Sequence, residues 1–218
     1  MFAGIIETRA EILSVEMRGK CRHIVIRKPN GWKLTVGESV SIDGICSTII
    51  ANIGKRFEVE YMPETLAKTT AIAFAPGHVV NLERSLRYGD RIHGHLVAGH
   101  VDAYGKILHI EKHGRSCIVS IPKPRKISRY IVEKGSVAVN GVSLTVAHAS
   151  TRSFDVALIP HTLAKTNLGL LTAGDAVNIE CDMLARYGLA GINRGATVRV
   201  HAKKRVRKKA QKPRRVKT

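Results

Sequence analysis

The chain has 218 residues, of which 44% are hydrophobic and 24% are charged. This balance is typical of a globular protein with one large or two small domains, and it excludes a fibrous repeat or a mostly disordered chain. The formal net charge of +19 is that of a nucleic-acid-binding protein, but twelve Lys and Arg residues and no acidic residue lie in 194–218. The first 193 positions carry 24 basic and 17 acidic residues, so the basicity belongs mostly to the C-terminal tail.

The cysteines and the N-terminal segment indicate the cellular compartment of the protein. The four cysteines are Cys21, Cys46, Cys117 and Cys181. They are far apart in the sequence and form no C-x-x-C pair, which argues against a zinc site. The segment MFAGIIETRAEI has an acidic residue by position 7 and no long apolar run, unlike a signal peptide. No stretch approaches the roughly 20 apolar residues of a membrane span. We therefore expect a cytoplasmic protein with free thiols and no membrane contact.

The predicted elements of the first half are mostly strands, in a unit that we expect to begin at Met1. The stretch 39–50, SVSIDGICSTII, places β-branched runs around Asp-Gly, which predicts a tight hairpin. The alternating stretch 57–62, FEVEYM, predicts a further strand. The stretch 63–69, PETLAKT, predicts one helical turn with Pro at its start. Gly77 then precedes a last strand that ends in Val-Asn-x-Glu.

The second half repeats the first. Residues 37–83 align with 134–180 at a constant offset of 97, without a gap and with 16 identities in 47 positions. The Asp-Gly hairpin becomes Asn-Gly, PETLAKT becomes PHTLAKT, and Val-Asn-x-Glu recurs. Short strands with turn-rich spacing, repeated twice, predict an all-β fold of two tandem, homologous Greek-key antiparallel β-barrels with a short basic tail. We expect the barrels at 1–95 and 96–190, with the boundary near 94–98, and a disordered tail at 191–218.

Three segments together resemble riboflavin synthase of the α-chain type. They are MFAGIIE at the N-terminus, NLERSLRYGDRIHGHLVAGHVDAYG in the middle, and KGSVAVNGVSLTV with LIPHTLAKTNLG later. The likeness runs from Met1 to about Tyr187 and covers both repeats. It implies a dismutation in which two 6,7-dimethyl-8-ribityllumazine molecules exchange a four-carbon unit, yielding riboflavin and a ribitylamino-pyrimidinedione, with no redox cofactor or metal. It also implies a homotrimer whose site lies between the first barrel of one chain and the second barrel of another.

The resemblance also implies which residues contact the substrate. Each pocket needs short polar side chains and exposed backbone groups for the ribityl hydroxyls and the ring edge. In the first barrel the matching positions are Gly4, Ile5, Ile6, Cys46, Ser47, Thr48, Glu60, Tyr61, Met62, Pro63, Glu64 and Thr65. At the junction and in the second barrel they are Gly99, His100, Val101, Lys134, Ser143, Leu144, Thr145, Ala157, Leu158, Ile159, Pro160, His161, Thr162 and Asp182.

Four of the residues implied by the resemblance are candidates for catalysis. His100 could act as a general base or proton shuttle, and Cys46 or Ser39 could add to the electrophilic carbon or position water on it. Lys134, reaching in from a neighbouring subunit, could neutralise negative charge on the pyrimidinedione. Because the second copy has Ser143 where the first has Cys46, we expect the chemistry in the first barrel.

Each candidate has a structural alternative. His100 could simply be packed at the domain junction, and Cys46 could be a small inert core residue. Lys134 and Asp182, the latter a candidate for holding ribityl hydroxyls, could be solvated charges at strand ends. The chain also departs from the family pattern, with Ala3 for Thr, Asp43 for Asn, Ser47 for Leu, and His93 for the first Gly of Gly-Gly-His. Ser47 removes an apolar group from beside the predicted pocket, which could weaken binding or only repack the surroundings.

The tail is a larger departure, because the family usually ends in an amphipathic helix that packs the trimer. The segment 191–218 has no sustained apolar stripe and contains a Pro. Its basic run could contact a polyanion weakly through counterion release, or could only add solubility. Three functions therefore remain: the synthase, a lumazine- or flavin-binding relative without turnover, and a nucleic-acid-associated protein that uses its tail.

Overall fold

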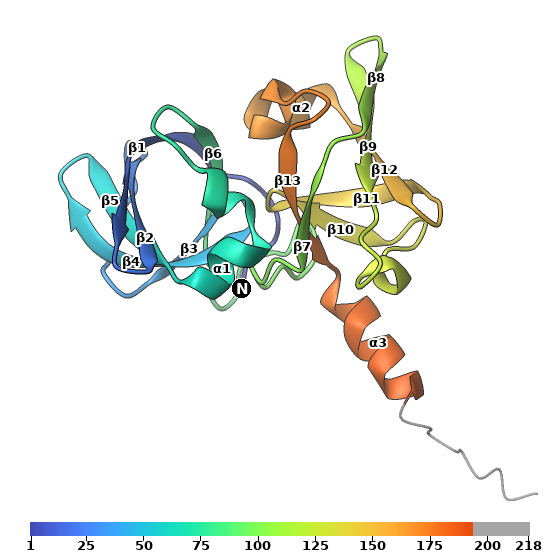
Figure 1. The fold of residues 1–218 in the computed structure, drawn as a ribbon, viewed down its shortest axis with the longest axis horizontal. Helices are drawn as coiled ribbons and strands as arrows, with labels where there is room; N and C mark the ends of the chain where they lie inside the picture. The colour runs from blue at the N-terminus through green and yellow to red at the C-terminus, as the bar shows by residue number, and fades with distance from the viewer. Residues whose placement is uncertain (194–218) are drawn as a thin grey trace, which may run out of the picture.

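The computed structural model describes residues 1–193, which form two barrels side by side and a C-terminal helix that projects away from them (Figure 1). The first barrel is closed and has the strand order β1-β2-β5-β4-β3-β6. Strand β6 returns beside β3 after three hairpin-connected strands, which is a Greek key. Its elements are β1 Thr8–Arg18, β2 Cys21–Arg27, β3 Ser39–Ile42, β4 Ile45–Ile53, β5 Arg56–Tyr61, α1 Pro63–Lys68, η1 Thr70–Ala73 and β6 Val79–Arg84.

The second barrel repeats this order but splits its first strand in two. The sheet order is β7-β13-β10-β11-β12-β9-β8, so the two pieces of the split strand lie at opposite edges. Ile107, between them, donates to the Asp175 carbonyl, and Leu108 donates to the Ser120 carbonyl. The sheet therefore curves into a barrel-like form without a closing ladder. Its elements are β7 Ala103–Lys106, β8 His109–His113, β9 Ser116–Pro122, η2 Ser128–Tyr130, β10 Ser136–Val139, β11 Val142–Ala149, β12 Ser153–Leu158, α2 Pro160–Lys165, η3 Asn167–Leu170 and β13 Ala176–Cys181.

The predicted hairpins and helical turns are confirmed. Asp43-Gly44 joins β3 to β4, and Asn140-Gly141 joins β10 to β11. All four turn residues have positive φ, between 46° and 80°, as a type I′ turn requires. Both short helices, α1 and α2, begin with the predicted Pro. The tandem all-β fold is thus the one that the sequence predicts.

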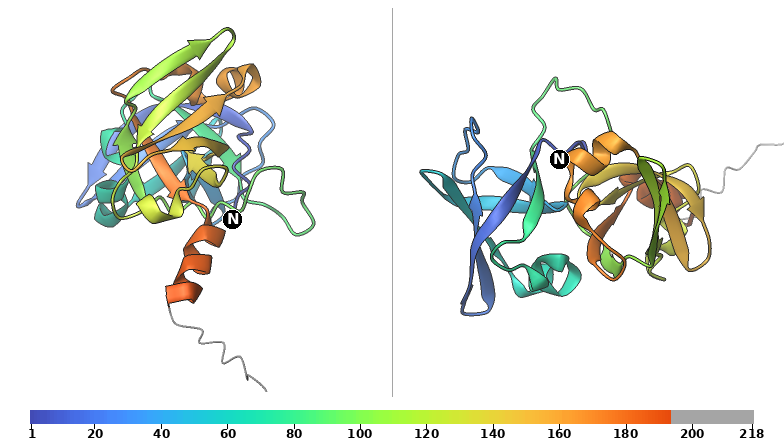
Figure 2. Two further views of the ribbon diagram at one scale, coloured as in Figure 1. Left: turned by 90° about the vertical axis from the view of Figure 1, so that its right-hand side faces the viewer. Right: turned by 90° about the horizontal axis from the view of Figure 1, so that it is seen from above.

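Each barrel has its own core, and the two barrels meet at their hairpin turns, while the linker after β6 arches from one barrel to the other (Figure 2). The cores are built around Phe57 in the first barrel and Phe154 in the second, both fully buried. At the contact a Cβ atom on Gly44 would lie 2.7 Å from the Gly141 nitrogen, and a Cβ atom on Gly141 would lie 2.7 Å from the Gly44 nitrogen. Only glycine therefore allows the two turns to approach so closely.

Reciprocal asparagines bond the two turns together. The Asn81 amide donates to the Asn140 carbonyl at 2.9 Å, and the Asn178 amide donates to the Asp43 carbonyl at 2.9 Å. The Asp43 carboxyl also accepts from the Asn81 backbone and the Asn167 amide. Burial outweighs these bonds and raises the pKa of Asp43 to about 7. The contact is therefore symmetric in its backbone but not in its charge.

Replacing Asp43 with Asn, the residue at the counterpart position 140, is expected to stabilise the protein above pH 7. Because the folded-state pKa of about 7 lies above the ordinary 3.8, the stability that protonated Asp43 contributes is complete below about pH 4 and lost as the pH rises through 7. The loss amounts to up to about 4 kcal/mol. The free energies of unfolding of the unmodified chain and of Asp43→Asn, measured by urea denaturation, should therefore differ mainly at pH 8 and little at pH 5. An equal difference at both pH values would contradict a buried carboxyl with a raised pKa.

The C-terminal helix and the N-terminal segment differ from the sequence prediction. Helix α3, Met183–Asn193, follows β13 and is capped by Asp182, whose carboxylate accepts from the Leu184 nitrogen at 2.9 Å. It includes residues 191–193, which the prediction assigned to the disordered tail, and the rest of that tail lies outside the described residues. The sheet of the first barrel begins at Thr8 rather than Met1, because residue Phe2 pairs with Val97 at the junction. No helix within residues 1–193 is both long and apolar enough to cross a membrane.

Candidate functional site

A cavity of about 520 Å³ lies on the outside of the first barrel, where β4, α1 and the start of the second repeat meet. Three of the predicted stretches contribute to it: Cys46, the segment 62–65, and Gly99 to Val101. Cys46 and His100 both line it. The lining residues are Ile45, Cys46, Met62, Pro63, Glu64, Thr65, Lys68, Thr69, Gly99, His100 and Val101.

The backbone of Gly99 forms one wall of this cavity directly against Cys46. The Cys46 nitrogen donates to the Gly99 carbonyl at 2.8 Å. Gly99 has a φ of +78°, and a Cβ atom there would lie 2.7 Å from the Cys46 Cβ. Val101 packs against the core of the first barrel, although it belongs to the second repeat. The segment from Gly99 to Val101 thus completes the first barrel's cleft.

The second barrel has the reciprocal arrangement. The Ser143 nitrogen donates to the Gly4 carbonyl at 2.8 Å, Gly4 has a φ of +73°, and a Cβ atom there would meet Ser143 at 2.6 Å. Ile6 packs against the core of the second barrel. The two repeats therefore exchange their leading segments, so that Cys46 in the first barrel and Ser143 in the second each pack against a glycine of the other repeat.

Two buried glutamates hold the exchanged segments in place. Glu83, at the end of β6, accepts from the nitrogens of Ala3 and Gly4 at 2.7 and 3.1 Å. Glu180, at the end of β13, accepts from Ala98 and Gly99 at 2.7 and 2.9 Å. Burial raises the pKa of both carboxyls to about 7, against the opposing effect of these bonds. Neither glutamate was among the predicted site residues, although the repeated Val-Asn-x-Glu motif ends in them.

Four residues predicted to contact the substrate have side chains inside the barrels. Ser47 and Tyr61 are buried and share a hydrogen bond of 2.7 Å between their hydroxyls. Their counterparts, Leu144 and Leu158, are buried in the second core. In a strand, alternate side chains face opposite sides, and Cys46 takes the outward position. Ser47 therefore lies beside Tyr61 in the barrel interior and does not line the cavity, which favours repacking of the core over a direct effect on binding.

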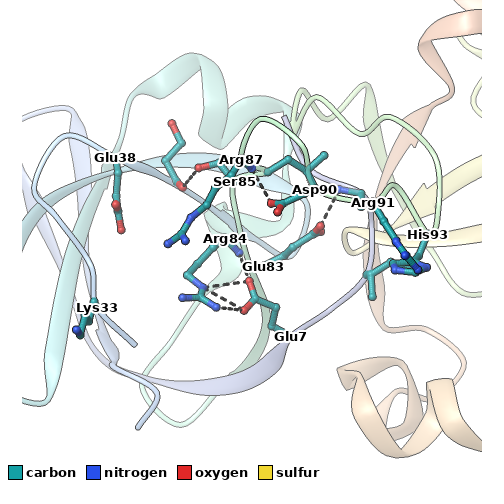
Figure 3. A pocket seen from close by; sticks show the side chains of 14 residues that line it. Glu7, Lys33, Glu38, Glu83, Arg84, Ser85, Arg87, Asp90, Arg91 and His93 are labelled. Atoms are coloured by element: carbon teal, nitrogen blue, oxygen red, sulfur yellow. Dashed lines mark hydrogen bonds and ion pairs between the residues drawn. The ribbon is translucent and has the colours of Figure 1, made fainter. Parts of the chain in front are cut away.

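Ser39 and Ile5 line a different cavity, of about 690 Å³, between β3, β6, the N-terminal segment and the linker. Arg84 and Glu7, which also line it, form an ion pair at 2.6 Å (Figure 3). Ser39 lies opposite Thr48 in the β3–β4 ladder. His93, a departure from the family pattern, also lines this cavity. Within this chain Ser39 thus does not share the cavity of Cys46 and His100.

The other predicted contacts lie mostly on the outer surface. Thr48 and Glu60 are exposed on the first barrel, and the exposed or partly exposed residues of the second barrel are Thr145, Ala157, Ile159, Pro160, His161 and Thr162. Lys134 is exposed and lines neither cavity. It has a φ of +64° where its counterpart is Gly37 with a φ of +93°. A lysine retained in this conformation is a strained residue, which is common at functional sites.

Two further features bear on the site. Asp182 caps helix α3 instead of standing free at a strand end, and it lies close enough to His95 to influence its pKa. Within residues 1–193 no group of three or more His, Cys, Asp or Glu side chains is arranged to hold a metal ion.

Comparisons with known proteins agree with the duplicated architecture. The lumazine binding domain model matches residues 3–85 and again 98–182. The chain is 42% identical over 195 residues to the riboflavin synthase of Brucella abortus (strain 2308), covering 86% of this chain and 96% of that one. It is 35% identical over 188 residues to the riboflavin synthase of Actinobacillus pleuropneumoniae, covering 86% and 87%. The crystal structure of LumP complexed with riboflavin matches with a TM-score of 0.78 at 21% identity, over 83% of this chain and 99% of that one.

Proposed function

The chain belongs to the riboflavin synthase family, and from this premise we propose that it converts two 6,7-dimethyl-8-ribityllumazine molecules into riboflavin and 5-amino-6-ribitylamino-pyrimidinedione by transfer of a four-carbon unit. The observation that carries the proposal is the pair of corresponding positions at Cys46 and Ser143, which have the same backbone bond to a glycine of the other repeat but different side chains. Equivalent backbones suit two copies of one flat substrate. The difference in side chains suits two copies with unequal roles.

The roles of the residues follow from their positions. His100 and Cys46 share one cavity, so the imidazole can remove a proton from the 7-methyl group while the thiol adds to the ring or positions water on it. The outward-facing hydroxyls of Thr48 and Thr145 would bind polar edges of the two ligands. Holding two reactants face to face removes much of the entropic cost of a bimolecular step.

We include a homotrimer in the proposal, working in the cytoplasm, with Lys134 reaching the first-barrel site of a neighbouring subunit. Helix α3 supports it, because Leu184 and Tyr187 lie on one side of the helix and are each 71% exposed. An apolar stripe of this kind is suited to packing against another subunit. The Arg186 guanidinium, which bonds to Asp102, holds α3 against the second barrel.

Replacing Leu184 and Tyr187 together with Glu is expected to dissociate the trimer into monomers and to reduce turnover in parallel. Two charges on this stripe would have to be buried without partners in the assembled state. Analytical ultracentrifugation measures the assembly, and Lys55→Glu in the exposed β4–β5 turn is the matched charge control. A double variant that stays trimeric would exclude α3 from the interface.

The alternative is a lumazine- or flavin-binding protein without turnover, as LumP is shown bound to such ligands. Incubating the purified chain with dimethylribityllumazine and following riboflavin fluorescence separates the two functions. The synthase produces riboflavin at a steady rate with no added cofactor. Tight binding of the lumazine without product would overturn the proposal.

A further inference from the structure

The hydroxyl of Ser143 is bonded to a histidine from the linker between the repeats. His95 Nδ1 lies 2.7 Å from Ser143 Oγ. Ser143 is the counterpart of Cys46, which has a free thiol and shares its cleft with His100. At the offset of 95 that aligns Gly4 with Gly99, the counterpart of His100 is Ile5. The histidine beside Ser143 is therefore not the counterpart of the histidine that lines the cavity of Cys46.

The backbone fixes His95 over Ser143. The His95 nitrogen donates to the Ala3 carbonyl at 3.2 Å, and Phe2 and Val97 exchange hydrogen bonds of 2.8 and 3.0 Å. At Gly94 a Cβ atom would lie 2.1 Å from the Ala3 carbonyl oxygen and 2.7 Å from the Ser143 Cβ. The linker therefore passes too close to Ser143 for any side chain at 94, and the next side chain is held in place.

The environment of His95 defines which ring nitrogen carries the hydrogen. Burial lowers the pKa of His95 more than the nearby Asp182 charge raises it, so the ring is neutral at pH 7 and has one N–H group. The Nε2 atom is buried without a partner within the described residues. A buried N–H group without an acceptor is rarer and costlier than an unfilled acceptor. The hydrogen therefore belongs on Nδ1, where Ser143 Oγ accepts it.

Resting on the proposed function, we propose that His95 is a positioning residue for a lumazine bound beside Ser143, at the place in the second lumazine-binding repeat that corresponds to the Cys46 cavity in the first. Its Nδ1–H donates to Ser143 Oγ, so the Ser143 hydroxyl hydrogen is free to donate to an acceptor atom of the ligand, a carbonyl oxygen or ring nitrogen of the heterocycle. Ser143 thereby fixes the orientation of one lumazine as a hydrogen-bond donor. In the first cleft Cys46, a weak donor, is left for the chemistry.

A double-mutant cycle tests whether His95 acts through Ser143. His95→Ala and Ser143→Ala are each expected to raise the KM for dimethylribityllumazine about tenfold with little change in kcat, the effect of one lost hydrogen bond in substrate binding. The double variant should be no worse than either single variant. Additive effects, or an unchanged KM in His95→Ala, would overturn the proposal.

Two conservative variants separate positioning from packing. The side-chain amide of Asn can replace Nδ1, whereas that of Gln reaches the place of Nε2, so His95→Asn should recover the KM and His95→Gln should not. His113→Ala, at an exposed histidine of the β8–β9 hairpin, should leave KM unchanged. Equal behaviour of Asn and Gln would refute the Nδ1 donor. If the unmodified chain forms no riboflavin, the proposed function fails separately, and the same cycle measured as equilibrium binding of dimethylribityllumazine still tests His95.

Discussion

Cys46→Ala is expected to lower kcat at least about 100-fold, whereas Cys46→Ser should retain activity within about tenfold of the unmodified chain. Cys46 points outward from β4 into the cavity that also contains His100, and its counterpart in the second barrel is already a serine. A hydroxyl can add to an electrophilic carbon or position water as a thiol does, but a methyl group can do neither. Single-turnover formation of riboflavin measures the chemical step directly.

Cys21→Ala is the matched control for this substitution. Cys21 has the same intermediate burial as Cys46 but lies at the β1–β2 hairpin, away from the cavity. The control should keep full activity and unfold at the same temperature. Full activity in both Cys46 variants would reduce Cys46 to a packing residue and remove the chemical argument for unequal barrels.

Gly44→Ala is expected to destabilise the protein by about 3 kcal/mol or more, and Gly141→Ala by a similar amount. Each glycine has a positive φ, which costs an L residue roughly 1 kcal/mol. In addition, the new Cβ atom would lie 2.7 Å from a backbone nitrogen of the opposite turn, which cannot move without breaking the bonds of Asn81 and Asn178. Urea denaturation of each variant measures the loss.

Gly77→Ala isolates the conformational part of this cost. Gly77 has a φ of +87°, but a Cβ atom there would have no neighbour within 4 Å, so its replacement should cost only about 1 kcal/mol. The combination of Gly44→Ala with Gly141→Ala should cost less than the sum of the two, because both relieve the same contact. Equal losses at positions 44 and 77 would show that the close approach of the barrels contributes nothing.

Local features of the fold were predictable from the sequence. The Asp43-Gly44 and Asn140-Gly141 turns depend on positive φ, which is a property of the turn residues themselves. The helical turns at Pro63 and Pro160 depend equally on local chemistry. The repeat then supplied the tandem architecture, because a gapless 47-residue match leaves little room for two different folds.

The site was less predictable, for two physical reasons. A contiguous motif in a strand contains residues of both faces, and a sequence match does not separate them, so it includes Ser47 and Tyr61, whose side chains face the barrel interior. The leading segments also lie outside the gapless match. Gly4 corresponds to Gly99, an offset of 95, whereas their partners Ser143 and Cys46 correspond at an offset of 97. Their exchange is a tertiary contact that no local pattern encodes.

The exchange of leading segments has a consequence for biosynthesis. The wall of the first cleft is made by residues 99–101, while Gly4 and Ile6 contact the second barrel, Gly4 through its bond from the Ser143 nitrogen. A nascent chain that has emerged only to the end of β6 can form a barrel but not a finished cleft. Residues 3 and 4 can already bond to Glu83, but their contact with the second barrel must wait, at a synthesis rate of about 5 to 20 residues per second, for some seconds until β11 is made. The cleft of the first barrel is thus completed only after the second repeat has begun to emerge.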